Sequence, residues 1–227
     1  MGQRCTVRAA AVLFDLDGVL VDSTVAVEGH WRAFAARHDL DAEALLANLH
    51  GRRMMDTMAA ALPDLSPARL AEEGARLEQA EVDGAREGTL PQPGAHELTA
   101  ALGGRPWAIV TSGTVPVALA RIEAVGLPPP LALVTGEEVA SGKPDPAPYL
   151  LAAQRLGVPP EDCVVIEDAP AGLAAGRAAG CATIAVTTSH PAGELAGADH
   201  VARNPADLGL VADDHQVVLA IRCTLHG

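Results

Sequence analysis

The sequence predicts an α/β protein with a Rossmann-like parallel sheet core and an inserted helical cap domain. Along most of the chain, short apolar runs alternate with helix-like stretches, a pattern typical of right-handed βα units and a mostly parallel sheet. Between residue 22 and about residue 90 the pattern is helical only. We therefore assign residues 1–21 and 92–227 to the core and residues 22–91 to the cap.

Five apolar runs have the length of buried strands. They cover residues 8–14, 107–111, 131–134, 163–167 and 182–186, and a weaker alternating stretch at residues 215–223 fits a last strand. The helix-like stretches between them are residues 95–102, 116–125, 148–156 and 170–179. Three of these begin with proline, which is favoured in the first helical turn because its missing N–H has no partner there. In such a sheet, active groups are expected at the carboxyl ends of the strands.

Four stretches rich in Ala, Leu, Glu and Arg predict the cap helices, at residues 24–38, 41–49, 53–61 and 67–82. Gly51 and Pro63 break this pattern, and the return segment at residues 88–94 has the glycine and proline content of a hinge. An insertion after the first strand would cover the strand ends as a lid. Lids of this kind exclude water from reacting groups.

The composition is that of a globular protein, with 49% hydrophobic and 20% charged residues. A net charge of −13 argues against nucleic acid as a partner, because binding the phosphate backbone needs a basic surface. No apolar run reaches the roughly 20 residues of a membrane helix, and the first ten residues do not resemble a secretory signal. The four cysteines form no CxxC pair, which favours reduced thiols and a cytoplasmic location. No feature requires a partner chain, so a monomer is compatible with the sequence and the oligomeric state is open.

One lysine stands out among the basic residues. Of the 16 lysines and arginines, only Lys143 is a lysine, and it lies in the proline-rich segment SGKPDP at residues 141–146. Lysine is a compact point charge, whereas arginine is a planar fork. Lys143 is therefore a candidate cation for an anionic substrate, although this clue alone fits a surface loop equally well.

Two carboxylates follow the first predicted strand. Asp15 and Asp17 are two residues apart, and Gly18 comes next. At a strand-to-loop turn both side chains can point into one cleft, where Asp15 can attack phosphorus and Asp17 can act as general acid and base. Carboxylates this close together differ in their readiness to ionise, which suits one nucleophile and one acid. Alone, the pair also fits a simple acidic turn.

Two further strand ends complete the constellation. The segment Thr111-Ser112-Gly113 offers a hydroxyl and backbone N–H groups to a phosphate oxygen, and Glu167-Asp168 adds a second acidic pair at the same edge. Asp15, Asp168 and a backbone carbonyl could hold Mg²⁺, which prefers oxygen ligands. The acidic groups would repel a phosphate dianion unless Mg²⁺ and Lys143 offset their charge. Jointly, these residues predict phosphoryl transfer.

The segments FDLDGVLVDS, VTSG, GKPDP and VVIEDAPAGLAAGRAAG resemble the four motifs of the haloacid dehalogenase superfamily, and the likeness covers nearly the whole chain. It implies that Asp15 is the nucleophile that forms an aspartyl-phosphate and that Asp17 is the general acid and base. The resemblance also implies the ligands of Mg²⁺, which would be Asp15, the Asp17 carbonyl and Asp168, with Glu167 near the metal through water. The phosphate ligands that it implies are Thr111, Lys143 and the backbone donors of Ser112 and Gly113.

Within the superfamily, the cap sequence LHGRR at residues 49–53, together with PWAIVTSG, is most similar to bacterial sugar and hexitol phosphatases and to yeast deoxyglucose-phosphate and glycerol-phosphate phosphatases. This resemblance implies hydrolysis of a small sugar or polyol monophosphate, with hexitol, hexose and glycerol phosphates all open as substrates. It places four residues on a cap loop that faces the substrate: His50, Gly51, Arg52 and Arg53. The alternative for the histidine and the arginines is a solvated helix end.

Several rival functions fit the residues less well. A β-phosphoglucomutase is the nearest, but its cap histidine would fall at Val27 and its phosphate-clamping arginine near Met54. Haloacid dehalogenation needs neither a metal nor a second carboxylate, so Asp17 and Asp168 argue against it, and phosphonate hydrolysis needs a cap lysine that this sequence lacks. A receiver domain would be shorter and would place its acidic pair before the nucleophile. A catalytically inactive binding module conflicts with the complete motif set.

Overall fold

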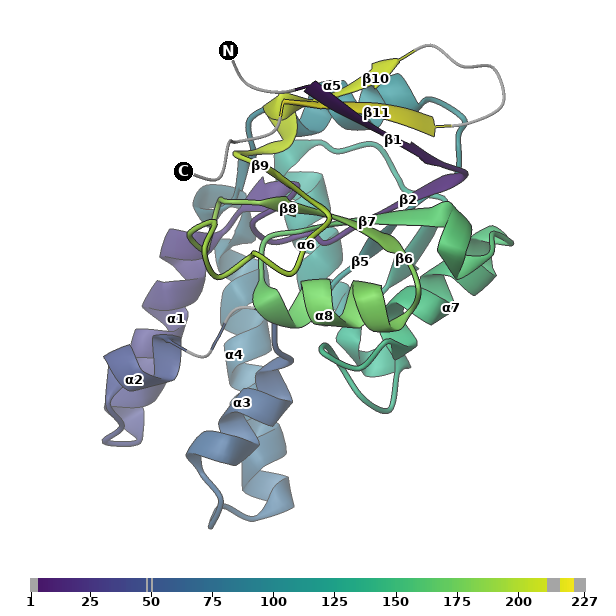
Figure 1. The fold of residues 1–227 in the computed structure, drawn as a ribbon. Helices are drawn as coiled ribbons and strands as arrows, with labels where there is room; N and C mark the ends of the chain where they lie inside the picture. The colour runs from purple at the N-terminus through teal and green to yellow at the C-terminus, as the bar shows by residue number, and fades with distance from the viewer. Residues whose placement is uncertain (1–3, 48, 50, 212–216, 223–227) are drawn as a thin grey trace.

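The computed structural model describes residues 4–47, 49, 51–211 and 217–222, and it confirms the predicted α/β class. A parallel sheet of six strands lies at its centre, in the order β6-β5-β2-β7-β8-β9 (Figure 1). The strands are β2 (Ala11–Phe14), β5 (Trp107–Val110), β6 (Ala132–Val134), β7 (Cys163–Glu167), β8 (Ala182–Val186) and β9 (His200–Ala202). The order makes β5, β2 and β7 direct neighbours.

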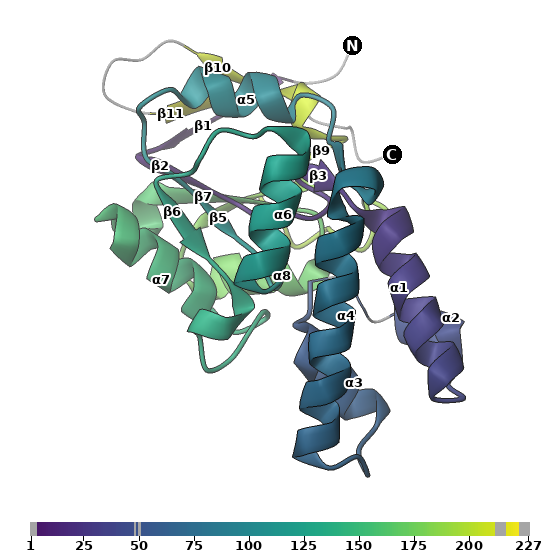
Figure 2. The same cartoon turned by 180° about the vertical axis from the view of Figure 1, so that it is seen from behind.

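Helices cover both faces of this sheet (Figures 1 and 2). α7 (Ala147–Leu156) and α8 (Pro170–Ala178) lie on one face, and α6 (Val115–Val125) lies on the other. Successive residues of β2 point to opposite faces, so Leu13 packs into the core with α7 and α8, and Phe14 packs into the core with α5 (Ala95–Leu102) and α6. Because both faces of the sheet are buried, the sequences of its strands are continuous apolar runs.

A second, antiparallel sheet has the order β1-β11-β10, formed by β1 (Arg4–Ala9), β11 (Val217–Arg222) and β10 (Leu208–Val211). The single strand predicted at residues 8–14 is therefore wrong in its bounds. The chain turns at Ala10, whose N–H donates to the carbonyl oxygen of Asp162 at 2.7 Å, so the run divides between two sheets. The described part of the predicted last strand is β11, and the rest of that stretch lies outside the described residues.

The cap consists of α1 (Thr24–Arg37), α2 (Ala42–Leu46), α3 (Met54–Ala61) and α4 (Pro67–Gly88). These helices enclose a small core of their own, which includes Trp31, Phe34 and Met58. α4 extends past the expected end at residue 82 because it packs along α6 of the core (Figure 2). None of the helices in the described ranges is long and apolar enough to span a membrane.

The two connections between cap and core lie side by side. β3 (Val21–Asp22) and β4 (Leu90–Pro91) pair as a short antiparallel ribbon. The boundaries predicted for the cap, at residues 22 and 91, fall in this ribbon. A paired ribbon of this kind can transmit a rigid-body movement of the cap, because both strands bend together.

Candidate active site

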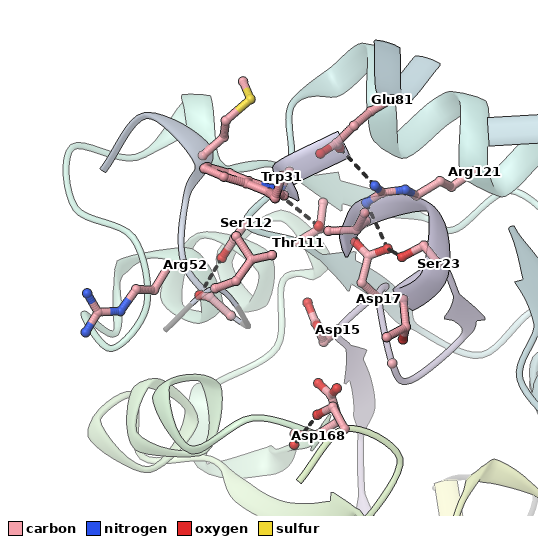
Figure 3. A pocket seen from close by; sticks show the side chains of 18 residues that line it. Asp15, Asp17, Ser23, Trp31, Arg52, Glu81, Thr111, Ser112, Arg121 and Asp168 are labelled. Atoms are coloured by element: carbon pink, nitrogen blue, oxygen red, sulfur yellow. Dashed lines mark hydrogen bonds and ion pairs between the residues drawn. The ribbon is translucent and has the colours of Figure 1, made fainter. Parts of the chain in front are cut away.

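Side chains from the ends of three neighbouring strands meet in one pocket (Figure 3). Asp15 follows β2, Thr111 follows β5 and Asp168 follows β7. Because these strands are parallel neighbours, their carboxyl ends lie at the same edge of the sheet. The pocket encloses about 110 Å³ between this edge and the cap. The structure thus brings together strand-end residues that the sequence singles out.

Lys143 is the buried cation of this site. Its ammonium group donates to Asp15 Oδ1 at 2.7 Å, to Glu167 Oε1 at 2.7 Å and to the carbonyl oxygen of Val110 at 3.0 Å, so all three protons have an acceptor. Burial lowers the pKa of a lysine, but the charges of Asp15 and Glu167 outweigh burial and hold the pKa of Lys143 above its ordinary value. Lys143 is not among the described residues that line the pocket, and it reaches the pocket through Asp15.

The carboxylates of the site outnumber its cations. Burial raises the pKa of Asp15 to about 7, against the effect of Lys143 and with a further contribution from Glu167. Burial, Glu167 and Asp15 also raise the pKa of Asp168 well above its ordinary value. Three buried carboxyl groups therefore face one ammonium group. A site with this surplus of negative charge is stabilised by a bound cation.

The donor set fits a divalent metal ion. One carboxylate oxygen each from Asp15, Glu167 and Asp168 lie within 4.8 Å of one another. Gly18 makes room for this cluster, because a Cβ at position 18 would lie 1.9 Å from Asp168 Oδ2. Clustered carboxylate oxygens are the ligands that hard divalent cations prefer.

Besides contributing an oxygen to the carboxylate cluster, Glu167 holds Lys143 in place. Its Oε1 accepts hydrogen bonds from Lys143 and from the Tyr149 hydroxyl at 2.9 Å. Its Oε2 accepts from the next two backbone N–H groups at 2.9 and 3.0 Å. A Cβ at Gly172 would lie 1.7 Å from Oε1, so the start of α8 is shaped around this carboxylate. With both oxygens already hydrogen-bonded, Glu167 suits a place beside a metal ion better than a direct bond to it.

Asp17 is held by two groups that sequence reasoning missed. Ser23 Oγ donates to Asp17 Oδ1 at 2.6 Å, and Arg121 Nη1 donates to both Asp17 carboxylate oxygens at 2.8 Å. Arg121 comes from α6 and is 6% exposed, and its Nη2 donates to Oε2 of Glu81 on α4 at 2.8 Å. One buried guanidinium therefore joins Asp17 of the core to Glu81 of the cap (Figure 3). The available sequence signal was a charged residue at a core-facing position of a largely apolar helix, whose other charged residue is Glu123.

The loop after β5 lines the pocket through Thr111, Ser112 and Gly113. Thr111 Oγ1 accepts from the backbone N–H of Gly113 at 3.0 Å. The Ser112 hydroxyl donates to the carbonyl oxygen of Gly51 in the cap at 2.9 Å. The predicted phosphate-binding loop is thus also a contact between core and cap.

The four residues predicted on the cap loop have different surroundings. His50 lies outside the described residues. Gly51 and Arg52 line the pocket, but the Arg52 guanidinium points away from Asp15 (Figure 3). Arg53 is not among the described residues of the pocket wall: its Nε and Nη2 pair with Asp56 at 2.7 and 3.0 Å. Its Nη1 donates at 3.4, 3.1 and 3.2 Å to three carbonyl oxygens of the core loop ahead of the lysine, those of Gly136, Val139 and Ala140.

The cap also gives the pocket an apolar wall, of which sequence reasoning singled out Val27 and Met54 but not Trp31 and Leu49. Its members are Val27, Trp31, Leu49 and Met54. Trp31 is 2% exposed and packs edge-on against Phe34, with ring centroids 5.5 Å apart. The ring is therefore fixed from behind and can present a rigid surface to a ligand.

With acidic strand ends enclosed by a helical lid, the molecule is a capped α/β hydrolase. The chain belongs to the haloacid dehalogenase-like hydrolase family, which it matches over residues 9–180. This match confirms the resemblance found in the sequence motifs.

The names of several relatives state a phosphatase activity. Hexitol phosphatase A of Escherichia coli is 50% identical over 181 residues, which cover 79% of this chain and 83% of the relative. Glycerol-1-phosphate phosphohydrolase 2 of Saccharomyces cerevisiae is 37% identical over 196 residues, which cover 81% and 77%. Among solved structures, CbbY from Rhodobacter sphaeroides in complex with phosphate has a TM-score of 0.77 at 28% identity, and the likeness covers 88% of this chain and 96% of that one.

Proposed function

We propose that this chain is a magnesium-dependent phosphatase that hydrolyses small sugar or polyol monophosphates through an aspartyl-phosphate on Asp15. The observation that carries the proposal is the 2.7 Å contact between Lys143 Nζ and Asp15 Oδ1 in a pocket covered by the cap. The lysine stabilises the ionised carboxylate that a nucleophile requires. The second oxygen, Oδ2, is then left to attack phosphorus.

The reaction has two halves. In the first, Asp15 attacks phosphorus, the bond from phosphorus to the leaving oxygen breaks, and Asp17 gives that oxygen a proton. In the second, Asp17 takes a proton from water, the water oxygen attacks phosphorus, and the bond from phosphorus to Asp15 breaks. Ser23 and Arg121 hold the carboxylate of Asp17 in place, and the hydrogen bonds that they donate suit the ionised form that takes the proton from water. Thr111 lines the same pocket, which supports a role for its loop in binding phosphate oxygens.

Asp15, Asp168 and the carbonyl oxygen of Asp17 would hold Mg²⁺, with Glu167 beside it through water. The chemistry that Mg²⁺ supplies when bound is neutralisation of charge on the phosphate oxygens. The three buried carboxyl groups and the single ammonium group support this assignment. Without a further cation, their surplus negative charge would oppose the approach of a phosphate dianion.

The shape and lining of the pocket support a small polyhydroxylated leaving group. The enclosed space is about 110 Å³, and the cap contributes Trp31 and Met54 together with the carboxylate of Glu81. A fixed aromatic face suits the C–H surface of a sugar or polyol, and polar groups beside it suit the hydroxyls. The hexitol and glycerol-1-phosphate phosphatases among the relatives support the same substrate class.

Transfer to water, rather than to a second sugar hydroxyl, is supported by two apolar cap positions. Val27 and Met54 stand where the resemblance would put the histidine and the arginine of a β-phosphoglucomutase, and both line the pocket. A substrate with a second phosphate would need a cation at that wall. Arg52 also lines the pocket, but its guanidinium points away from Asp15 (Figure 3).

The proposal is tested by phosphate release from a panel of phosphorylated hexitols, hexoses and glycerol. We expect turnover that requires Mg²⁺, and a loss of about 10³-fold or more in Asp15→Asn, because the nucleophile is removed. Asp64→Asn is the matched control, since Asp64 is exposed in the cap, outside the pocket. Wild-type turnover by Asp15→Asn would show that the nucleophile is another group, and no turnover of any monoester by the wild type would reject the phosphatase.

A further inference from the structure

Glu81 is a carboxylate of the pocket wall to which the reaction gives no task. It lies on α4 of the cap, and its side chain is 11% exposed. Its Oε2 accepts from Arg121 Nη2 at 2.8 Å. Within the described part of the chain, Oε1 has no hydrogen-bond donor, although this carboxylate faces the pocket.

The charge of Glu81 is not needed to balance Arg121. Arg121 already pairs with Asp17, at 2.8 Å from both of its oxygens, so Glu81 adds a second carboxylate to one guanidinium. Burial raises the pKa of Glu81, Arg121 opposes that shift, and Asp17 adds to it. Keeping a surplus buried carboxylate costs stability that an apolar side chain of the same size would not. The Glu81 oxygen that has no donor within the described residues can accept a hydrogen bond from a bound ligand.

The position of Glu81 identifies that donor. Arg121 binds Asp17 through Nη1 and Glu81 through Nη2, so the two carboxylates lie next to each other on the same guanidinium group (Figure 3). Asp17 acts on the leaving oxygen of the substrate. With the leaving oxygen at Asp17, the first carbons of the leaving group would lie beside Glu81, where a sugar or polyol carries its hydroxyl groups.

We propose that Glu81 determines specificity by accepting a hydrogen bond from a hydroxyl group of the leaving group, and that Arg121 is the positioning residue that orients it. The inference rests on the proposed function, because it assigns a substrate contact in the same site. A carboxylate only accepts hydrogen bonds, so it selects leaving groups that donate. It also repels a second anionic group on the substrate, which favours monophosphates over bisphosphates. A substrate without the hydroxyl would leave the buried carboxylate unpaired, and such mismatches discriminate strongly.

The test compares two substrates with three variants. Sorbitol 6-phosphate carries hydroxyls beside the ester, whereas ethyl phosphate has the same ester and no hydroxyl. Glu81→Met keeps the length of the side chain and removes the acceptor, and Glu81→Gln keeps an acceptor oxygen and removes the charge. Glu87→Met is the control, because Glu87 is exposed on the same helix and is not among the residues of the pocket wall. Melting temperature verifies that each variant is folded.

We expect the loss of kcat/KM in Glu81→Met to be at least about 10-fold larger for sorbitol 6-phosphate than for ethyl phosphate, with Glu81→Gln between Glu81→Met and the wild type. Equal losses on the two substrates, or no loss on either, would overturn the inference. Arg121→Lys should lose activity on both substrates, since one ammonium group cannot reproduce the two separate guanidinium nitrogens that bind Asp17 and Glu81. If Arg121→Lys kept wild-type kinetics, its positioning role would be wrong. Wild-type protein that hydrolyses neither these two esters nor any other monoester of the panel would instead reject the proposed function.

Discussion

The side chain of Arg53 passes directly over Gly142: a Cβ at position 142 would lie 2.9 Å from Arg53 Cδ. Gly136 leaves room for the same side chain, because a Cβ at position 136 would lie 3.1 Å from Arg53 Cδ. Arg53 belongs to the cap, whereas both glycines belong to the core loop that leads to Lys143. The two glycines leave space for the Arg53 side chain, and three carbonyl oxygens of the same loop accept hydrogen bonds from its guanidinium. Together they form a socket for this arginine of the cap. Contact of the cap with the core thus reaches the segment that carries Lys143.

Arg53→Ala should therefore weaken closure of the cap over every substrate. We expect kcat/KM to fall by a similar factor, about 10-fold, across the substrate panel, because several hydrogen bonds between cap and core are lost. The neighbouring variant Arg52→Ala is the matched comparison, and we expect its losses to differ from one substrate to another. Substrate-dependent losses in Arg53→Ala would return that residue to a role in substrate recognition.

Gly142→Ala should reproduce the effect of Arg53→Ala, because the added Cβ collides with the arginine stem. Both changes remove the same contact, so the double variant should be little worse than either single one. The measurement is a double-mutant cycle on kcat/KM. Effects that simply add would mean that Arg53 and Gly142 act independently, which contradicts the socket.

Lys143→Ala should lose about 10²-fold or more in kcat/KM, because the ionised nucleophile and the phosphate lose their compact cation. Lys143→Arg should rescue little of this loss, since the three acceptors around Nζ are arranged for an ammonium group. Lys143→Ala leaves Glu167 and Asp15 buried without their cationic partner and should melt at lower temperature. Unchanged kcat/KM in Lys143→Ala would contradict the role assigned to this residue.

The free energy of unfolding should depend on pH and on Mg²⁺ through the carboxyl group of Asp15. Its pKa rises from 3.8 in a model peptide to about 7 in the folded protein, so between these values the folded state binds more protons than the unfolded chain. The free energy of unfolding of the metal-free protein should therefore fall as the pH rises through this range. Mg²⁺ should restore it at about pH 8, because an ion that binds only the folded state stabilises that state.

Thermal melting in a chelator at several pH values measures this effect. Asp15→Asn removes a titrating group and should show a smaller loss of melting temperature as the pH rises than the wild type does. The pKa of Asp168 is raised like that of Asp15, so the melting temperature of the variant should still depend to some extent on pH. Identical pH profiles for the two proteins would mean that Asp15 does not carry the raised pKa.

The sequence predicted the parallel sheet and its acidic edge because both depend on local patterns. An apolar run with both faces buried can be recognised without knowing its neighbours, and the carboxyl ends of parallel strands must share an edge. This is why Asp15, Thr111 and Asp168 could be grouped in advance. The missed strands include β3 and β4 with two residues each, β9 with three and β10 with four, which are too short to show a clear period.

Contacts between the cap and the core could not be read from the sequence. The link from Arg121 to Glu81 spans 40 positions and requires α4 to pack along α6, and neither helix encodes that packing in its own pattern. Arg53 next to Arg52 gave no sign that one guanidinium would enter a core loop while the other lines the pocket. The division of the run at residues 8–14 was missed for the same reason, because β1 finds its partner in β11 at the other end of the chain.

Trapping the covalent intermediate tests the central claim most directly. Protein mixed with Mg²⁺ and excess substrate is quenched and treated with borohydride, which reduces an acyl phosphate to an alcohol, and the peptides are sequenced by mass spectrometry. If Asp15 carries the phosphoryl group, residue 15 should be recovered as homoserine, only when substrate was present and not in Asp15→Asn. Homoserine at another aspartate, or steady phosphate release by the wild type with residue 15 unreduced throughout, would contradict the account.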